Sequence, residues 1–151
     1  MSMMTHQTPE WLKQILFVLS QRGIASAANV EGCSECEIVE ISKNCLLPLR
    51  YREFLEVMGK GAGTFFLGTD IFYPSIVGLT EDAASLVSED PTGITLPEDA
   101  VVFSMHQGYE MMFFRTNDGE DPPVYYYMER SGRFQQKYVH FSEYLMICAN
   151  E

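Results

Sequence analysis

Basic residues are scarce in this sequence. Its 151 residues include 10 Lys and Arg against 21 Asp and Glu, which gives a formal net charge of -11 at pH 7. Nucleic-acid phosphates and anionic membranes repel such a chain, because each approach works against the electrostatic field. We therefore expect neither nucleic acid nor a membrane as a direct partner, and the charge favours a basic protein partner.

Long apolar runs and a high density of cysteine are also missing. The longest apolar stretch near the start covers only residues 15–19, and it lacks the charged flank and cleavage site of a secretion signal. Four cysteines in 151 residues are too few for a disulfide-stabilised scaffold. These absences predict a cytoplasmic location, where thiols stay reduced.

Catalytic and metal-binding motifs are absent as well. The sequence contains no GxSxG motif and no cysteine with a suitably placed histidine. The glycine-rich run 59–63 lacks the pattern of a phosphate-binding loop. A zinc site needs a second pair of ligands beside Cys33 and Cys36, and the sequence offers none at a suitable spacing. We expect no enzymatic activity, no catalytic residue, no cofactor and no metal.

The Cys33 and Cys36 pair leaves one alternative open. A helix capped by Ser34 would place Cys36 at its N-terminus, where a thiolate is stabilised. A thioredoxin-like site should follow a strand, however, and no strand is predicted before these residues. Incidental thiols are therefore favoured, and thiol chemistry ranks third among the functional interpretations.

What is present is an apolar chain of single-domain size. Hydrophobic residues make up 46% of the sequence and aromatic residues 13%, which is too apolar for a disordered chain. A chain of this length can bury an independent core. With no repeat, linker or low-complexity tract, the sequence predicts one domain.

The first part of the chain has a helical pattern that ends near residue 58. Thr8 and Pro9 predict the start of a first helix and Gly23 its end. A short connector follows, and Ser34 and Glu37 then form a capping-box pattern for a second helix. The apolar positions expected to face the core are Trp11, Ile15, Val18 and Leu19 in the first helix, Ile38, Ile41 and Cys45 in the second, and Tyr51, Phe54, Leu55 and Met58 in a third helix after Pro48.

The second part of the chain changes to the shorter period of strands. Turn-forming residues at 106–108, 117–119 and 130–132 separate the last four strand candidates. Helices first and a mostly antiparallel sheet later predict the α+β class. The expected elements are a strand at 64–67, a helix at 80–89 capped by Thr80, strands at 101–105, 109–115, 124–129 and 134–140, and a closing helix capped by Ser142.

Acidic residues gather where basic ones are missing. No Lys or Arg lies between Lys60 and Arg115, and a second acidic group precedes Pro122. A surface of one sign steers a basic partner and raises its association rate. The alternative is an ordinary solvated surface whose acids serve helix N-termini and turns. The candidate partner-binding residues are Asp70, Glu81, Asp82, Glu89, Asp90, Glu110, Asp118, Glu120 and Asp121, with Tyr126 as an exposed ring.

Four segments together resemble the Smi/Knr branch of the SUKH superfamily. Residues 47–55, Leu-Pro-Leu-Arg-Tyr-Arg-Glu-Phe-Leu, followed by Gly59 and Gly61, are similar to its first signature. The later similarities lie at 96–109, at 121–125 and at 141–145, in matching order, and the resemblance as a whole covers residues 35–148. It implies an α+β fold with N-terminal helices packed on a bent antiparallel sheet and a short C-terminal helix.

The resemblance also implies function. Many bacterial members are non-enzymatic immunity proteins that bind and neutralise toxins, often nucleases, and others are intracellular regulatory or scaffold modules. Residues 1–32 match no part of the family pattern. The expected organisation is therefore a single SUKH-like domain over 1–151, with 1–32 as a less certain helical extension.

Charge and resemblance lead to the same hypothesis. A nuclease must be basic to hold phosphates, so an acidic protein can compete for that surface. We expect an immunity protein that binds a basic toxin domain through its acidic residues. The alternative is an intracellular scaffold or regulatory module of the same fold, and the oligomeric state stays open.

Overall fold

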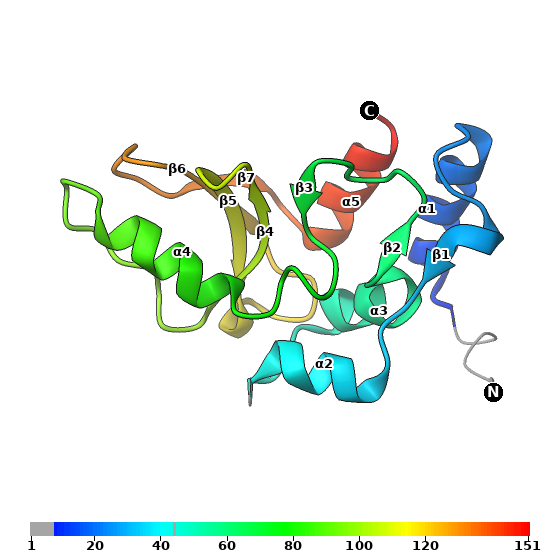
Figure 1. Cartoon of the computed structure of the whole chain (residues 1–151), viewed down its shortest axis with the longest axis horizontal. Coiled ribbons are helices and arrows are strands. Elements are labelled where there is room, and N and C mark those ends of the chain that lie inside the picture. The colour runs from blue at the N-terminus through cyan, green and yellow to red at the C-terminus, as the bar shows by residue number, and fades with distance from the viewer. Residues whose placement is uncertain (1–7, 44) are drawn as a thin grey trace.

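Helices occupy the start, middle and end of the chain, and strands lie between them (Figure 1). The computed structural model describes residues 8–43 and 45–151. The predicted α+β class is confirmed, as is the short C-terminal helix. The elements of the described part are α1 (Glu10–Gln21), η2 (Ala27–Asn29), β1 (Val30–Glu31), α2 (Glu35–Ser42), α3 (Leu49–Met58), β2 (Gly61–Ala62), β3 (Thr69–Asp70), α4 (Leu79–Ser88), β4 (Ala100–His106), β5 (Glu110–Arg115), η3 (Thr116–Asp118), β6 (Val124–Met128), β7 (Gln135–Tyr138) and α5 (Phe141–Ala149).

The main sheet is an antiparallel meander. Its strands lie in sequence order from β3 to β7, so each strand pairs with the next along the chain. The β4–β5 turn follows the prediction, since Gln107 and Gly108 both have positive φ, at 55° and 81°. A second, two-stranded sheet joins β1 to β2. Short connections link β4 to β7, whereas the connection from β3 to β4 contains the helix α4.

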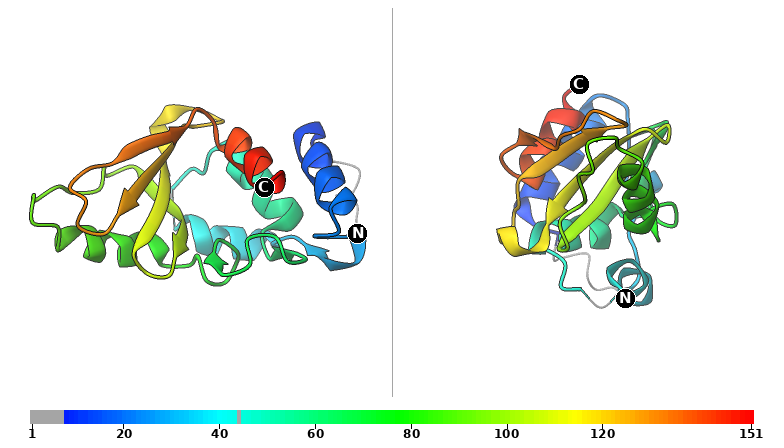
Figure 2. Two further views of the ribbon diagram at one scale, coloured as in Figure 1. Left: turned by 90° about the horizontal axis from the view of Figure 1, so that it is seen from above. Right: turned by 90° about the vertical axis from the view of Figure 1, so that its left-hand side faces the viewer.

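Helices cover the two faces of the main sheet unequally. The helix α4 packs on β4, and α3 and α5 lie against the other face, with α1 packed behind α5 (Figure 2). Rings from four elements meet under α3 and α5: Tyr51 is 5.0 Å from Phe114 and 5.5 Å from Phe141 between ring centroids. Phe103 lies 5.3 Å from Phe114 and 5.2 Å from Phe141. This aromatic cluster is the centre of the core.

Several local predictions are confirmed. The capping box of α2 is present, because the Glu37 backbone N–H donates to Ser34 Oγ over 3.2 Å and the Ser34 N–H donates to Glu37 Oε1 over 2.8 Å. The predicted apolar stripe of α3 is buried in full, and Tyr51, Phe54 and Met58 each have 1% exposure or less. The capping box forms within one helix turn, and helical spacing is sufficient to show which positions of α3 share a face.

Other local predictions are wrong. Residues 64–67 form a turn, with Phe66 at φ 60°, and the strand follows at β3 instead. The helix α2 ends at Ser42, before Cys45. The expected connector includes β1, whose partner β2 is distant in the sequence: Val30 pairs with Ala62. These features depend on partners distant in sequence.

The expected helix caps also differ from the structure. Pro9 and not Thr8 occupies the N-cap position of α1. The helix α4 begins one residue before Thr80, whose hydroxyl accepts a hydrogen bond from the Val102 N–H over 3.0 Å. The N-cap position of α5 is His140, and Ser142 donates to Asp121 instead. Two of these hydroxyl residues thus join separate segments rather than end a helix.

The helix α1 packs closely on the rest of the fold. Leu12, Ile15 and Leu19 are fully buried, and Arg22 Nη1 donates to the Ala149 carbonyl of α5 over 2.6 Å. The small sheet adds a second attachment through β1. We propose that residues 8–32 belong to the same cooperative folding unit as the sheet.

The Ile15→Ala substitution tests this proposal. We expect it to lower the free energy of unfolding by about 2–5 kcal/mol, because it leaves a cavity between α1 and α5. Phe17→Ala on the same helix is the control: Phe17 is 64% exposed, and the loss should stay within about 0.5 kcal/mol. Urea denaturation followed by fluorescence and circular dichroism measures both. A separate early transition for α1 would show that it is a detachable extension.

Candidate functional site: a cleft on the open half of the sheet

The helices α3 and α5 cover only one half of their sheet face. Near the start of β4 they bury Phe114, which is 0% exposed. Further along the strands, two rows of paired residues face the same side: Ser104, Met112 and Tyr126 form one row, and His106, Glu110 and Met128 form the other. Apart from Ser104, these side chains are only partly buried. The uncovered half of the face forms the floor of a cleft of about 540 Å³.

The walls of the cleft come from two other segments. The turn 64–69 borders it on the β3 side, and the end of α5 borders it with Tyr144, Cys148 and the adjoining Glu151. Leu67 is 83% exposed at this rim, beside Phe66. The cleft therefore combines an apolar rim with a floor that carries polar groups.

The polar groups of the floor are linked to one another. The Tyr126 hydroxyl donates a hydrogen bond to the Glu110 carboxylate, and the Lys137 ammonium lies 4.5 Å from the centroid of the Tyr126 ring. On the opposite side of the cleft, Thr69 Oγ1 and His106 Nδ1 are 3.0 Å apart. Burial, together with the hydrogen bond to Glu110, raises the pKa of Tyr126 to about 12, so this hydroxyl remains a donor at neutral pH.

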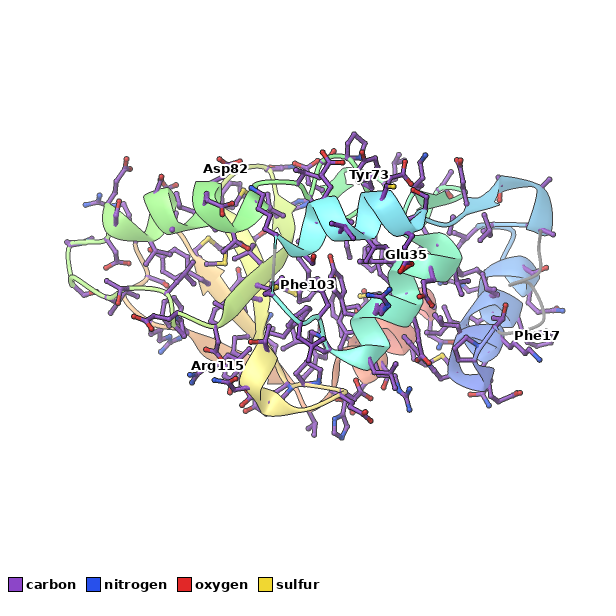
Figure 3. All side chains as sticks on the ribbon, turned by 90° about the horizontal axis from the view of Figure 1, so that it is seen from below. Phe17, Glu35, Tyr73, Asp82, Phe103 and Arg115 are labelled. Atoms are coloured by element: carbon purple, nitrogen blue, oxygen red, sulfur yellow. The ribbon has the colours of Figure 1, made fainter. Side chains whose placement is uncertain are left out.

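Two of the sequence-predicted residues, Glu110 and Tyr126, lie together in this cleft. The other acids do not join them. Glu81, Asp82 and Glu89 are exposed on or next to α4, which covers the opposite face of the sheet, and Asp70 is exposed on the edge strand β3. Asp118 and Glu120 are exposed in the loop after Arg115. Asp82 and Arg115 lie on opposite sides of the molecule in Figure 3.

Asp90 is a correction to the predicted surface. It is only 5% exposed, and its carboxylate accepts hydrogen bonds from the Thr92 N–H and hydroxyl, the Tyr127 hydroxyl and the Gly132 N–H at 2.6–2.9 Å. These donors, with the Tyr127 hydroxyl first, hold the pKa of Asp90 well below its usual range. Asp90 therefore joins the turn after α4 to the β6–β7 turn and is not available to a partner.

Asp121 also has a structural role. Its carboxylate accepts from the Ser142 N–H over 2.9 Å and from the Ser142 hydroxyl over 2.6 Å, and its carbonyl oxygen lies 2.7 Å from His140 Nδ1. A carboxylate at the first turn of a helix is also favoured by the helix dipole. Asp121 thus fixes the N-terminus of α5, and both oxygens of its carboxylate accept from Ser142.

Sequence reasoning missed the cleft residues that lie outside the acidic runs. Lys137 faces the cleft by alternation from Gln135, the partner of Tyr126, and Tyr138 joins it because the β6–β7 register shifts between Val124 and Tyr125. The sequence predicts His106 only as part of a turn. The alternation of the strand predicted at 124–129 is the signal that identifies Tyr126. The sequence also predicts the neighbouring strand, but it does not reveal the register in which the two strands pair.

The four cysteine thiols differ in how deeply they are buried. The four cysteines, all within the described residues, are free. Cys33 packs against Gly59, where an added Cβ would lie 2.6 Å from Cys33 Sγ, and burial raises the pKa of Cys33 to about 11. Burial likewise raises the pKa of Cys148 to about 12. A redox pair needs a lowered pKa, so the structure gives Cys33 a packing role.

The described part of the chain contains no group of three or more His, Cys, Asp or Glu side chains that could hold a metal ion. No helix in it combines the length and apolar character needed to cross a membrane.

The Tyr127→Phe substitution tests the role of Asp90. Removing the hydroxyl takes one donor from the carboxylate, and we expect the free energy of unfolding to fall by about 1–3 kcal/mol at pH 7. Because the lowered pKa of Asp90 contributes stability above the unfolded pKa of about 4, this contribution is lost as the pH falls through and below that value. The difference between wild type and variant, measured by thermal unfolding from pH 7 to pH 2, should narrow. A constant difference would contradict the assignment.

Thiol titration tests the packing role of Cys33. At pH 8 we expect the exposed thiols of Cys36 and Cys45 to react with DTNB in the native protein, whereas Cys33 reacts only after unfolding, because its burial and its raised pKa leave little accessible thiolate. Cys36→Ser should remove one fast-reacting group. A reversible disulfide between Cys33 and Cys36 in the native protein would instead support redox chemistry.

Comparison with known proteins identifies the family. A SUKH family model described as SMI1-KNR4 cell-wall matches residues 34–145. The matched stretch runs from the cap of α2 into α5, and it includes the whole main sheet and the floor of the cleft. No curated protein matches the chain at a significant level. Since the match covers well over half of the sequence and confirms the resemblance found in its motifs, the chain belongs to the SMI1-KNR4 family of the SUKH superfamily.

Proposed function

We propose that this chain is a non-enzymatic immunity protein that binds a basic toxin domain, such as a nuclease, and blocks it. Membership of the SMI1-KNR4 family supports an immunity or interaction role. The net charge of -11 supports a basic partner, because opposite charges attract over the distance of a Debye length before contact. The proposed location is the cytoplasm, where such a protein would meet an incoming toxin.

The observation that carries the proposal is the uncompensated charge around α4. The helix and its end display Glu81, Asp82 and Glu89 to solvent. Among the described residues, a single ion pair reaches this group: Lys43 Nζ lies 3.5 Å from Glu81 Oε1, and both side chains are at least half exposed. An exposed pair of this kind contributes little and is screened by salt. The surface around α4 therefore stays negative.

The shape of α4 also suits close approach. The exposed positions between its acids are small: Ala84, Ser85 and Ser88. A partner can therefore lie against the helix without displacing long side chains. Acidic side chains at both ends of α4, with small side chains between them, suit the electrostatic steering of a basic protein domain.

A regulatory or scaffold role is the second candidate. It is favoured by the description of the matched family, which names the cell wall. Both candidates predict a protein partner, but only the immunity role requires the partner to be a toxin. Deleting the gene should then have an effect only when the toxin is present, whereas loss of a scaffold should affect cells grown alone.

Affinity capture with the full chain tests the choice between these roles. At low salt we expect the chain to retain the basic C-terminal domain of a large secreted protein, and to release more of it as the salt is raised, because screening weakens the attraction. Mass spectrometry identifies the retained protein. Recovery of intracellular housekeeping proteins alone would support the scaffold role.

Charge reversal tests the surface around α4. With the captured domain, we expect Glu81→Lys together with Asp82→Lys to slow association about three- to tenfold and to change dissociation little. Glu10→Lys is the matched control, since Glu10 is likewise exposed in the first turn of a helix, at the α1 end of the molecule. Asp118→Lys with Glu120→Lys tests the second acidic loop separately. Stopped-flow measurements at two ionic strengths give the rates, and unchanged association would remove α4 from the interface.

A further inference from the structure

The cleft already holds a cation that belongs to the chain itself. Lys137 comes from the edge strand β7, and its ammonium lies 4.5 Å from the centroid of the Tyr126 ring. The same ring carries the hydroxyl that donates to Glu110. The register shift between β6 and β7 places Lys137 and Tyr138 together in the cleft. The Tyr126 ring and the Glu110 carboxylate in the floor of the cleft can therefore interact with a positive charge.

Lys137 is weakly held in this position. Its residue is exposed, and among the described residues no carboxylate lies within ion-pair distance of its ammonium. An exposed contact between an ammonium and an aromatic face is worth only about 0.5–1 kcal/mol. A cation that also met Glu110 would therefore displace Lys137 from the ring.

The Glu110 carboxylate has unused acceptor positions for such a cation. Only its Oε2 accepts from Tyr126, and an ionised carboxylate offers about four acceptor positions over its two oxygens. No described basic side chain forms an ion pair with it. The formal charges that line the cleft, Glu110 and Glu151 against Lys137, leave an excess of one negative charge if His106 is neutral. One entering cation would balance this excess.

We propose that the cleft receives an arginine side chain of a protein partner, with the guanidinium stacked on Tyr126 in place of Lys137 and paired with Glu110. This inference rests on the proposed function and names the contact that would anchor a basic partner. Arginine fits better than lysine because its planar guanidinium stacks on aromatic rings, pairs with a carboxylate through two hydrogen bonds and is more weakly hydrated.

The remaining surfaces of the cleft suit the rest of that side chain. Met112 and Tyr138 provide a partly apolar floor for the aliphatic stem of arginine. Leu67, 83% exposed at the rim, offers a contact for an apolar residue next to the arginine. A central arginine in a pocket with an apolar surround is a common form of interface anchor.

A small probe tests the cleft without any toxin. N-acetyl-arginine amide is titrated into the full chain, and the methionine methyl groups are followed by carbon-13 NMR. We expect saturable shifts at Met112, in the cleft, with a Kd of about 1–10 mM, and none at Met58, the fully buried last residue of α3. N-acetyl-citrulline amide, which has a neutral side chain of similar shape, should cause no saturable shift. Equal responses to both probes, or none, would overturn the proposal.

Three variants sharpen this test. Glu110→Gln should weaken binding of the arginine probe about tenfold, because the carboxylate is lost. Lys137→Met should strengthen it about threefold, since the competing ammonium is removed while the side-chain length is kept. Glu10→Gln, an exposed acid on α1 outside the cleft, should change nothing. Weaker binding in Lys137→Met would contradict the displacement of Lys137.

The two proposals can fail separately. If the arginine probe does not bind while the captured basic domain still associates in a salt-dependent way, the cleft proposal is overturned and the immunity proposal stands. If the probe binds as expected but no basic protein domain is retained, the cleft stands as an arginine site and the immunity role fails.

Discussion

The packing of four aromatic rings determines the rest of this structure. Tyr51 of α3, Phe103 of β4, Phe114 of β5 and Phe141 of α5 lie with ring centroids 5.0–6.2 Å apart. Each ring removes a large apolar area from water, and the edge-to-face contacts add a directional term. Because the rings come from two helices and two strands, they fix where α3 and α5 sit on the sheet. The position of these helices, in turn, sets which part of the sheet stays open.

The cleft is a direct consequence of that arrangement. The cluster draws both helices toward the Ala100 and Arg115 end of the strands, and the rows that contain Met112 and Glu110 remain uncovered. Two carboxylates hold the surrounding segments in place: Asp121 at the start of α5, and Asp90 between the turns next to α4 and β7. Acids whose carboxylates accept several hydrogen bonds therefore organise the fold.

Local sequence was sufficient for the helices and the tight turns, because their contacts lie within a few residues. Local sequence could not distinguish acids that hold segments of the fold together from acids that are exposed to solvent. Asp90 resembles any acid in a turn, and its role depends on Tyr127, 37 residues away. The same limit applies to the cleft: alternation places the Tyr126 ring on one face of its strand, whereas the cation near it, Lys137, belongs to the neighbouring strand β7 and depends on the pairing of Tyr126 with Gln135. Which residues of distant segments pair with each other depends on the packing of the whole core, and this cannot be read from a short stretch of sequence.

The two surfaces considered for a partner lie on opposite faces of one sheet, and their chemistry differs accordingly. Charge around α4 acts at a distance and is screened by salt, whereas the cleft can act only on contact, through a ring, a carboxylate and apolar walls. The edge strand β3 connects them, since Thr69 faces the cleft through His106 and the next residue, Asp70, points to the other face. A single partner that used both surfaces would therefore have to lie across β3. In that position, attraction by α4 would bring a basic side chain to the mouth of the cleft.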